Sequence, residues 1–543
     1  MLVVLFAAVT IAVLAWTEPE LRLLGFATTA TAALAACVGL FTGDFERATL
    51  LTALITIAII GASMVKFHHS ARKLIVADFP LMFAGTVPFF FAQYRRMMTG
   101  LCVSAVILSA AAVASLFWAA GPTLPFNVRS LILAGCSAAA LFAYRRCGGA
   151  AYFRAGVTQP RNYASTFAAS ALDVASWWPS RGLTIVDVAD VALPLAQPIA
   201  QRSDTRPDII LIQHESVFDP RVFGLSIEPD IADFFTPPQG QSGTLNVEIF
   251  GGGSWQSEFS VLAGIASGAF GTDSYFLFKK GVGRFHHSLP QMLSALGYRT
   301  MLASSCRRSF LNYDAFYRGI NVRERVFSDD FAAPFDVVAF EQTYTDARFL
   351  PAALGAFADK LDGDPAPRFL YALTNFNHGP HTHRLASPAF DASRAFALRA
   401  LPDAEYAEYY ARLAETAAAW RAVKSELAAR FPSRPMLIVH YGDHQPVMTR
   451  RMEAKLHLSA DPARTFTTFH AIEGLNFLPM GTAPRRLEIA LLGTCVTQAA
   501  GLPLDAITAT RAGFLDGLPD AESEANKRRL VRTMLEQKLI DLS

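Results

Sequence analysis

Charged residues are scarce in this sequence: they make up 17% of the 543 residues, whereas apolar residues make up 52%. A soluble protein of this size normally carries more charge. The shortage is concentrated in residues 1 to about 144, which are dominated by Leu, Ala, Val, Ile and Phe, while the rest resembles an ordinary globular chain. The composition therefore describes two parts, one suited to lipid and one suited to water.

Cysteine and clustered basic residues are also sparse. The six cysteines form no CxxC pair and no Cys/His cluster, so neither a disulfide framework nor a structural zinc site is indicated. The net charge is only +2, and no dense stripe of lysine or arginine is present, as binding to a phosphate backbone would require. These absences argue against nucleic acid as the main partner.

Long apolar runs define residues 1–146 as the expected transmembrane domain. A spanning helix needs roughly 20 apolar residues, and we expect spans at about Leu23–Phe41, Ala48–Val65, Gly100–Ala120 and Val128–Tyr144. Met1–Trp16 is shorter, but it lacks the basic region and cleavage site of a signal peptide, so we expect a fifth span there. These spans contain almost no ionisable residues, which disfavours a transporter and indicates an anchor.

The segment 66–98 is expected to be interfacial. Its apolar run Phe79–Gln93 is short, contains two prolines and is flanked by lysine and arginine, as in interfacial or re-entrant segments. If it does cross the bilayer, six crossings place both chain ends on one side. The basic loop within this segment, together with Arg145 and Arg146, would by the positive-inside tendency place the C-terminal part in the cytoplasm.

The remaining chain is divided into three expected parts: an interfacial connector at 147–205, a site-bearing domain at 206–520 and a C-terminal tail helix at 521–543. The connector suits either the headgroup region or an ordinary linker. In the large domain, "PDIILIQHES", "FLYALTNFNHG" and "PMLIVHYGDHQP" are apolar strands that end in polar residues, with helical patterns between them. This alternation predicts an α/β fold with a mainly parallel sheet, whose ligand site lies beyond the carboxyl ends of the strands.

Chemically versatile residues follow these strands. Glu215 follows the first strand, His378 the second, and Asp443 with His444 the third, while Ser254 follows three glycines and opens a helical pattern. Carboxylates supply oxygen ligands and imidazole supplies a nitrogen ligand, and this mixed set suits Mn²⁺ or Zn²⁺. A serine hydroxyl becomes a useful nucleophile when a base or metal favours its alkoxide, and a helix N-terminus helps to hold phosphate. Each pattern alone is common in ordinary loops, but their shared placement predicts one site.

These motifs resemble the lipoteichoic acid synthase group of the alkaline phosphatase–sulfatase superfamily, whose relatives include periplasmic phosphoglycerol and phosphoethanolamine transferases. The resemblance implies that Glu215, Ser254, Asp443 and His444 bind the metal. Ser254 would be the catalytic nucleophile, at the position where the synthases have threonine. "TNFNHGP" is similar to a family segment whose histidine contacts the substrate, here His378.

Two departures from related patterns affect the expected substrate. The stretch "YRTMLASSCRRSFLNYDAFY" lacks the His-Gly pair and the Trp-x-Arg motif with which the synthases hold phosphoglycerol. Arg308, or its neighbour Arg307, is the candidate substrate-binding substitute. The motif "SWQSE" lacks the Pro and Arg of the sulfatase signature C/S-x-P-x-R, so hydrolysis of sulfate esters is not expected.

The resemblance implies a multi-pass protein of the bacterial inner membrane with an extracytoplasmic catalytic domain, in spite of the charge rule. It implies a divalent metal ion (Mn²⁺, Zn²⁺ or Mg²⁺), a membrane phospholipid donor and an envelope glycan or lipid acceptor. A phosphoglycerol or phosphoethanolamine group would pass through a phospho-seryl intermediate. A membrane-anchored phosphodiesterase or phosphatase-type hydrolase is the open alternative, while a non-catalytic sensor or scaffold is disfavoured by the intact set of site residues.

Overall fold

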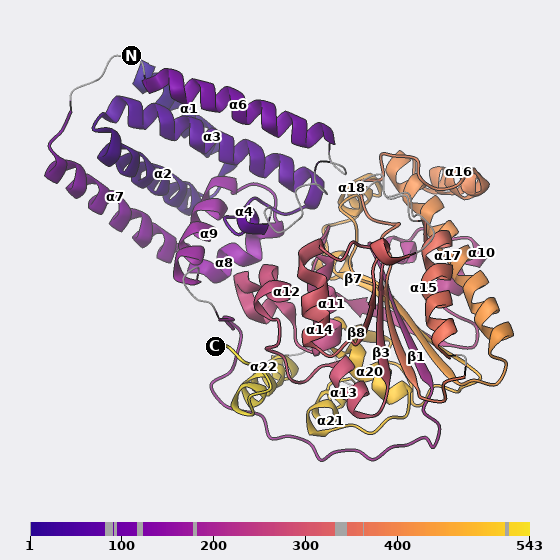
Figure 1. Cartoon of the computed structure of the whole chain (residues 1–543). Helices are drawn as coiled ribbons and strands as arrows, with labels where there is room; N and C mark the ends of the chain where they lie inside the picture. Colours follow the sequence, from indigo (N-terminus) through magenta and orange to yellow (C-terminus); the bar gives the residue numbers. More distant parts are fainter. Residues whose placement is uncertain are drawn as a thin grey trace. The chain divides into compact units, whose positions relative to one another are not determined.

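The chain forms two compact units, Met1–Ser180 and Arg181–Ser543, in a computed structural model (Figure 1). The division between them falls inside the segment 147–205 that the sequence predicts as a connector. The structure describes residues 2–81, 91, 95–116, 123–177, 182–331, 345–361, 363–515 and 521–543.

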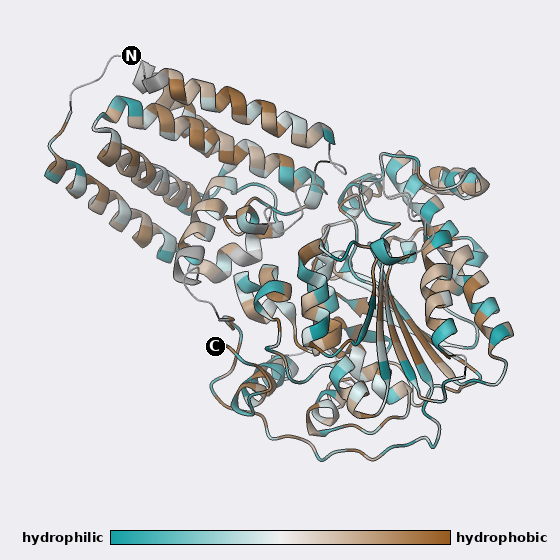
Figure 2. Ribbon diagram, viewed as in Figure 1, coloured by the Kyte–Doolittle hydropathy of each residue, from teal (hydrophilic) through white to brown (hydrophobic). Residues whose placement is uncertain are grey.

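The first unit consists of helices, most of them long and apolar (Figure 2). They are α1 (Leu2–Thr17), α2 (Leu21–Thr42), α3 (Phe45–Ser70), α4 (Asp78–Leu81), α6 (Arg95–Leu116), α7 (Phe126–Arg146), α8 (Gly149–Ala155) and α9 (Tyr163–Trp177).

Four of the described helices are long and apolar enough to cross a membrane: α2, α3, α7 and the part Met97–Ala114 of α6. They coincide with the four spans expected from apolar run length, although the end of the third, residues 117–120, lies outside the described residues. The described part of the run Met1–Trp16 lies in α1 (Leu2–Thr17), but at 16 residues this helix is shorter than those four. Most of Phe79–Gln93 lies outside the described residues, so its interfacial placement stays a prediction.

Polar side chains tie α9 to the end of α1. Glu18 is 1% exposed, and its carboxylate accepts hydrogen bonds from the Ala164 amide at 2.9 Å and the Ser165 hydroxyl at 2.5 Å. Lys73, equally buried, donates to Thr166 Oγ1 at 3.0 Å. The first part of the predicted connector therefore packs within the helical unit.

The second unit is built around an eight-stranded sheet with the order β4-β3-β5-β1-β6-β7-β2-β8. Strands β1, β3, β4, β5 and β6 are mutually parallel, while β7 runs antiparallel to both β6 and β2. The prediction of a mainly parallel α/β sheet is confirmed. The strands are β1 (Asp208–His214), β2 (Gln241–Asn246), β3 (Arg299–Ser304), β4 (Glu324–Val326), β5 (Arg368–Leu373), β6 (Met436–Gly442), β7 (Thr467–Leu475) and β8 (Arg486–Glu488).

Helices cover both faces of this sheet, with α10, α15 and α17 on one side and α11 and α14 on the other (Figure 1). The helices of this unit are α10 (Pro229–Phe235), α11 (Ser254–Ala263), α12 (Leu277–Lys280), α13 (Leu289–Ala295), α14 (Tyr313–Gly319), α15 (Asp346–Leu361), α16 (Asp391–Ala400), α17 (Ala404–Arg430), α18 (Thr449–Lys455), α19 (Pro462–Thr465), α20 (Leu492–Ala499), α21 (Ala506–Ala512) and α22 (Ala521–Glu536).

The central strands β1, β5 and β6 are buried along their whole length, as expected of parallel strands covered on both faces. Their apolar side chains on one face join those of α10, α15 and α17 in a single hydrophobic core. This rigid centre fixes the positions of the loops that leave the carboxyl ends of the strands.

We expect Leu413→Ala, in the core face of α17, to lower the free energy of unfolding of the second unit by about 2–5 kcal/mol, because it deletes buried methyl groups and leaves a cavity. Leu413 is fully buried, whereas Leu398 on α16 is 41% exposed. Leu398→Ala is therefore the matched control and should change little. Urea unfolding followed by hydrogen exchange of the β5 and β6 amides measures both; equal effects would contradict the assignment of the core.

Candidate active site

The site begins with the register of two neighbouring parallel strands. In the β1–β6 pair, Gln213 lies opposite Tyr441 and His214 opposite Gly442. The next residues along each strand are Glu215 and Asp443, so the register brings the two carboxylates together at the same edge of the sheet. Both are buried, at 4% and 0% exposure.

The backbone of β6 approaches the backbone of the loop after β1 very closely at this edge. A Cβ placed on Gly442 would lie 1.8 Å from the carbonyl oxygen of Val217, so only glycine fits between β6 and the loop after β1. Ser216 has a positive φ of 57°, its amide donates to Asp443 Oδ1 at 2.7 Å and its hydroxyl donates to Glu215 Oε1 at 2.8 Å. The loop is therefore tied directly to the two carboxylates.

Ser254 arrives from the other side of the site as the first residue of α11. The three preceding residues Gly251, Gly252 and Gly253 all have positive φ, which L side chains rarely adopt, so the glycine run is needed for this turn. The Gly251 amide donates to the carbonyl of Gln445 at 2.9 Å, which fastens the turn to the loop after β6.

The Ser254 hydroxyl lies next to the acidic cluster. It donates to Glu215 Oε2 at 2.6 Å and is 3.4 Å from His444 Nε2. The same His444 nitrogen lies 3.2 Å from Glu215 Oε1 and 3.6 Å from Asp443 Oδ2. The structure thus brings together the four residues that the sequence assigns to metal binding and nucleophilic attack.

Glu215, Asp443 and His444 form a group that could hold a metal ion, since one ligand atom from each lies within 4.8 Å of the others. Asp443 Oδ2 is buried and accepts no hydrogen bond from the part of the chain that the structure describes. A buried carboxylate oxygen without a hydrogen bond costs free energy, which a divalent cation would recover. The donor set of two carboxylates and one imidazole therefore fits such a cation.

The charges of this cluster shift one another. Burial raises the pKa of Glu215, but the charge and hydrogen bond of His444, with a smaller effect of His378, bring it below its ordinary value. Burial and the Glu215 carboxylate raise the pKa of Asp443 to about 7. Burial lowers the pKa of His444, but the two carboxylates more than reverse this and raise it to about 9. The cluster thus favours one positive charge at its centre.

His378 lies in the loop after β5, the other neighbour of β1. Because β5 is parallel to β1, this loop leaves the sheet at the same edge as Glu215. The ring Nδ1 of His378 is 2.5 Å from the carbonyl of Gly379. Its assignment as a substrate-binding residue stays a prediction.

Arg308 lies after β3 and is engaged elsewhere. Its guanidinium forms ion pairs of 2.6 Å with both Asp314 and Asp330 and stacks over the ring of Phe327. The structure therefore ties Arg308 to a local carboxylate network, and its role in substrate binding stays a prediction.

Sequence reasoning passed over Glu258, one helical turn after Ser254 on α11. Glu258 is 1% exposed, and its carboxylate accepts hydrogen bonds from Tyr313 at 2.7 Å and from Tyr317. Burial raises the pKa of Glu258 to about 8. The glutamate of "SEF" was visible in the sequence, but only the tyrosines of α14 show that it fastens the helix that carries the nucleophile.

Residues 207–469 match the sulfatase family model, and this range contains all the candidate site residues. Fold and site together define the second unit as an α/β domain of the alkaline phosphatase–sulfatase superfamily, as its motifs indicated. The chain thus carries a sulfatase-like domain, and the apolar helices lie N-terminal to that domain.

Individual relatives are distant. An uncharacterised protein of Haemophilus influenzae is 24% identical over 321 residues, which cover 55% of this chain and only about half, 54%, of that protein. The integral membrane lipooligosaccharide phosphoethanolamine transferase A of Neisseria meningitidis has a similar fold, with a TM-score of 0.52 at 13% identity over 93% of this chain and 98% of that chain. The comparison with a phosphoglycerol transferase of Streptococcus pyogenes, GacH, gives a TM-score of 0.49 at 15% identity. It covers 63% of this chain and 92% of that chain.

We expect Asp443→Asn and His444→Ala each to lower the affinity of the purified chain for Mn²⁺ or Zn²⁺ by roughly tenfold or more, because the first replaces a charged carboxylate by a neutral amide and the second removes the imidazole. Titration calorimetry measures the affinity without any substrate. His457→Ala, an exposed histidine, is the control. Unchanged affinity in both site variants would show that the cluster holds no metal.

Proposed function

We propose that this protein transfers a phospho-headgroup, phosphoglycerol or phosphoethanolamine, from a membrane phospholipid to an envelope glycan or lipid through a phospho-seryl intermediate on Ser254. The observation that carries this proposal is the position of the Ser254 hydroxyl, 2.6 Å from Glu215 and beside a buried cluster suited to a divalent cation. The fold shared with a phosphoethanolamine transferase that is also an integral membrane protein supports it.

Glu215, Asp443 and His444, with Ser254 itself, would hold the divalent cation, Mn²⁺ or Zn²⁺. When bound, such a cation stabilises an alkoxide on serine and neutralises charge on the phosphoryl oxygens. The described residues alone already orient the nucleophile, because the hydrogen bond to Glu215 and the glycine turn fix the hydroxyl at the start of α11.

In the first step, Ser254 Oγ attacks the phosphorus of the phospholipid, and its proton leaves along the hydrogen bond to Glu215. The new Oγ–P bond forms as the bond from phosphorus to the diacylglycerol oxygen breaks, and His378 gives that oxygen its proton. The N-terminal end of α11 faces the transferred phosphate with its positive dipole.

In the second step, a hydroxyl of the acceptor attacks the phosphoserine. The acceptor gives its proton to His378, the Oγ–P bond breaks, and Ser254 takes back the proton held at Glu215, so the enzyme returns to its starting state. Because the donor and its by-product are both lipids, the apolar helices α2, α3, α6 and α7 would keep the enzyme at its substrate. Within this proposal the protein is a multi-pass protein of the bacterial inner membrane with an extracytoplasmic catalytic domain.

Intact-mass analysis of the full chain tests the intermediate directly. After incubation with Mn²⁺ and vesicles of phosphatidylglycerol or phosphatidylethanolamine, we expect a mass gain of one phosphoglycerol or phosphoethanolamine group on Ser254. Ser254→Ala should abolish the adduct and lower diacylglycerol release by roughly 10³-fold or more, as loss of a nucleophile does in other enzymes.

Ser425→Ala, which removes a hydroxyl from the exposed side of α17, is the control and should form the adduct normally. Rapid loss of the adduct to water in the absence of acceptor would favour the hydrolase. An adduct that persists in Ser254→Ala would disprove the nucleophile.

The orientation in the membrane is tested separately. An alkaline phosphatase reporter fused after Ser543 should be active, because this reporter matures only outside the cytoplasm, where the proposal places the catalytic domain. A fluorescent protein that matures only in the cytoplasm should be dark at the same position. The opposite pair of results would support the orientation favoured by the basic residues Arg145 and Arg146.

A further inference from the structure

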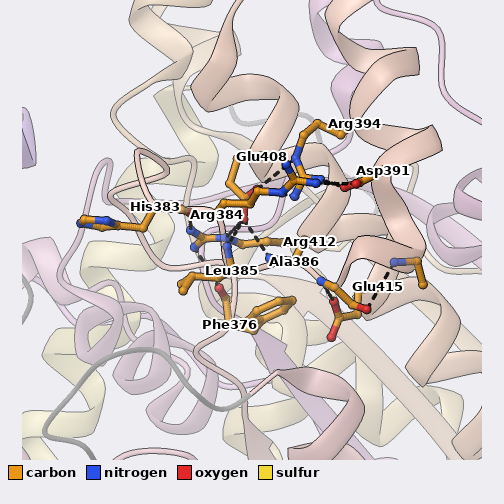
Figure 3. A network of polar contacts seen from close by, with 12 residues as sticks. Phe376, His383, Arg384, Leu385, Ala386, Asp391, Arg394, Glu408, Arg412 and Glu415 are labelled. Atoms are coloured by element: carbon orange, nitrogen blue, oxygen red, sulfur yellow. Dashed lines mark hydrogen bonds and ion pairs between the residues drawn. The ribbon is translucent and has the colours of Figure 1, made fainter.

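The loop from Phe376 to Ser387 carries His378 and connects β5 to the short 3₁₀ turn Pro388–Phe390 that precedes α16. It lies against one face of α17, where a group of charged side chains meets it (Figure 3). Such a long loop would be expected to vary in conformation unless its backbone is fastened. The position of His378 therefore depends on the contacts that fasten this loop.

Three charged residues of α17 face this loop. Glu408, Arg412 and Glu415 are spaced by four and three positions, so they lie in a row on one side of the helix. They are 4%, 0% and 4% exposed. A helix normally keeps such residues on its solvated face, and burial of three of them in a row requires specific partners.

Arg412 binds the loop backbone at several points. Nη1 donates to the carbonyls of Phe376 at 3.3 Å and of His378 itself at 3.1 Å, and Nη2 donates to the carbonyl of His383 at 2.9 Å. Nε donates to Glu408 Oε1 at 3.1 Å. One rigid guanidinium thus spans the loop on both sides of His378.

The two glutamates bind the next part of the loop. Glu408 Oε1 accepts hydrogen bonds from the amides of Leu385 at 2.7 Å and Ala386 at 2.9 Å, and Glu415 Oε2 accepts one from Ser387 at 2.9 Å. Arg394 of α16 donates to Glu408 Oε2 at 2.6 Å and balances its charge (Figure 3). The carboxylates therefore hold loop amides while Arg412 holds loop carbonyls.

An arginine that only stabilised α17 would need no more than its neighbour Glu408. Among the described residues, the guanidinium instead donates to three carbonyls of the loop that carries His378, and one of these carbonyls belongs to His378. The planar fork of arginine suits this divergent arrangement, and the point charge of lysine does not. Burial of the group makes each bond costly to break, because no water can replace the lost partner.

We propose that Arg412 is a positioning residue for the transfer reaction: it holds the backbone of His378 so that the imidazole is kept at the Ser254 site. This inference rests on the proposed function, in which His378 protonates the leaving oxygen. Glu408 and Glu415 extend the same clamp to residues 385–387.

A double-mutant cycle on the full chain tests this role, with adduct formation on Ser254 from phosphatidylglycerol and phosphatidylethanolamine vesicles as the readout. Arg412→Gln should slow the adduct at least tenfold when His378 is present, but less than twofold in the His378→Ala background. Arg412→Lys, which keeps the charge and disturbs packing less, should give an intermediate loss. A purely structural role of Arg412 would reduce the rate by the same factor in both backgrounds, and that result would overturn the proposal.

Hydrogen exchange gives a readout that does not depend on catalysis. Arg412→Gln should speed exchange at the amides of residues 376–387 and leave those of β5 unchanged. Arg421→Gln, on the exposed side of the same helix, is the matched control and should affect neither exchange nor rate. Unchanged loop exchange in Arg412→Gln would refute the clamp. If Arg412→Gln speeds loop exchange but the wild-type chain forms no adduct, the proposed function alone is refuted.

Discussion

The site depends on one close backbone contact, that between Gly442 at the end of β6 and the carbonyl of Val217 in the loop after β1. This approach lets two parallel strands in register end at the same level, so that Glu215 and Asp443 follow side by side. A side chain at position 442 would push the loop away and separate the carboxylates. The hydrogen bond from Ser216 to Asp443 then fixes a spacing that the strands have already set.

Two buried carboxylates this close together repel each other when both are ionised, and burial removes the water that would screen them. The two acids oppose each other's ionisation, and the imidazole of His444 lies near both, 3.2 Å from Glu215 and 3.6 Å from Asp443. An arrangement of this kind is costly for a structural core and useful for binding a cation. The nucleophile is added by a separate element, α11, whose start is fixed by a glycine turn on one side and by Glu258 with two tyrosines on the other. The sheet edge therefore positions the carboxylates, and the first turn of α11 positions the Ser254 hydroxyl.

Much of this could be read from the sequence because strand ends are marked by abrupt changes in polarity. The apolar runs before Glu215, His378 and Asp443 predicted strands of a mainly parallel sheet, and the structure shows them as the adjacent strands β1, β5 and β6. The strands β2, β3, β4, β7 and β8 were not predicted. Of these, β2, β4 and β8 are only partly buried and carry no sustained apolar pattern. Arg412 was missed for a related reason. A charged residue in an amphipathic helix looks solvated, and only the loop packed against it reveals that it is buried.

The same limit applies to headgroup recognition. Sequence position suggests Arg308, but its charge is shared with Asp314 and Asp330, both at 2.6 Å. To bind a phosphate or glycerol group, Arg308 would have to give up at least one of these ion pairs. Because the Arg308 side chain is 41% exposed, solvent screening would reduce the cost of breaking one of these ion pairs. The sequence shows that an arginine is present after β3 but not that its guanidinium is already paired, so a motif comparison alone does not specify the donor.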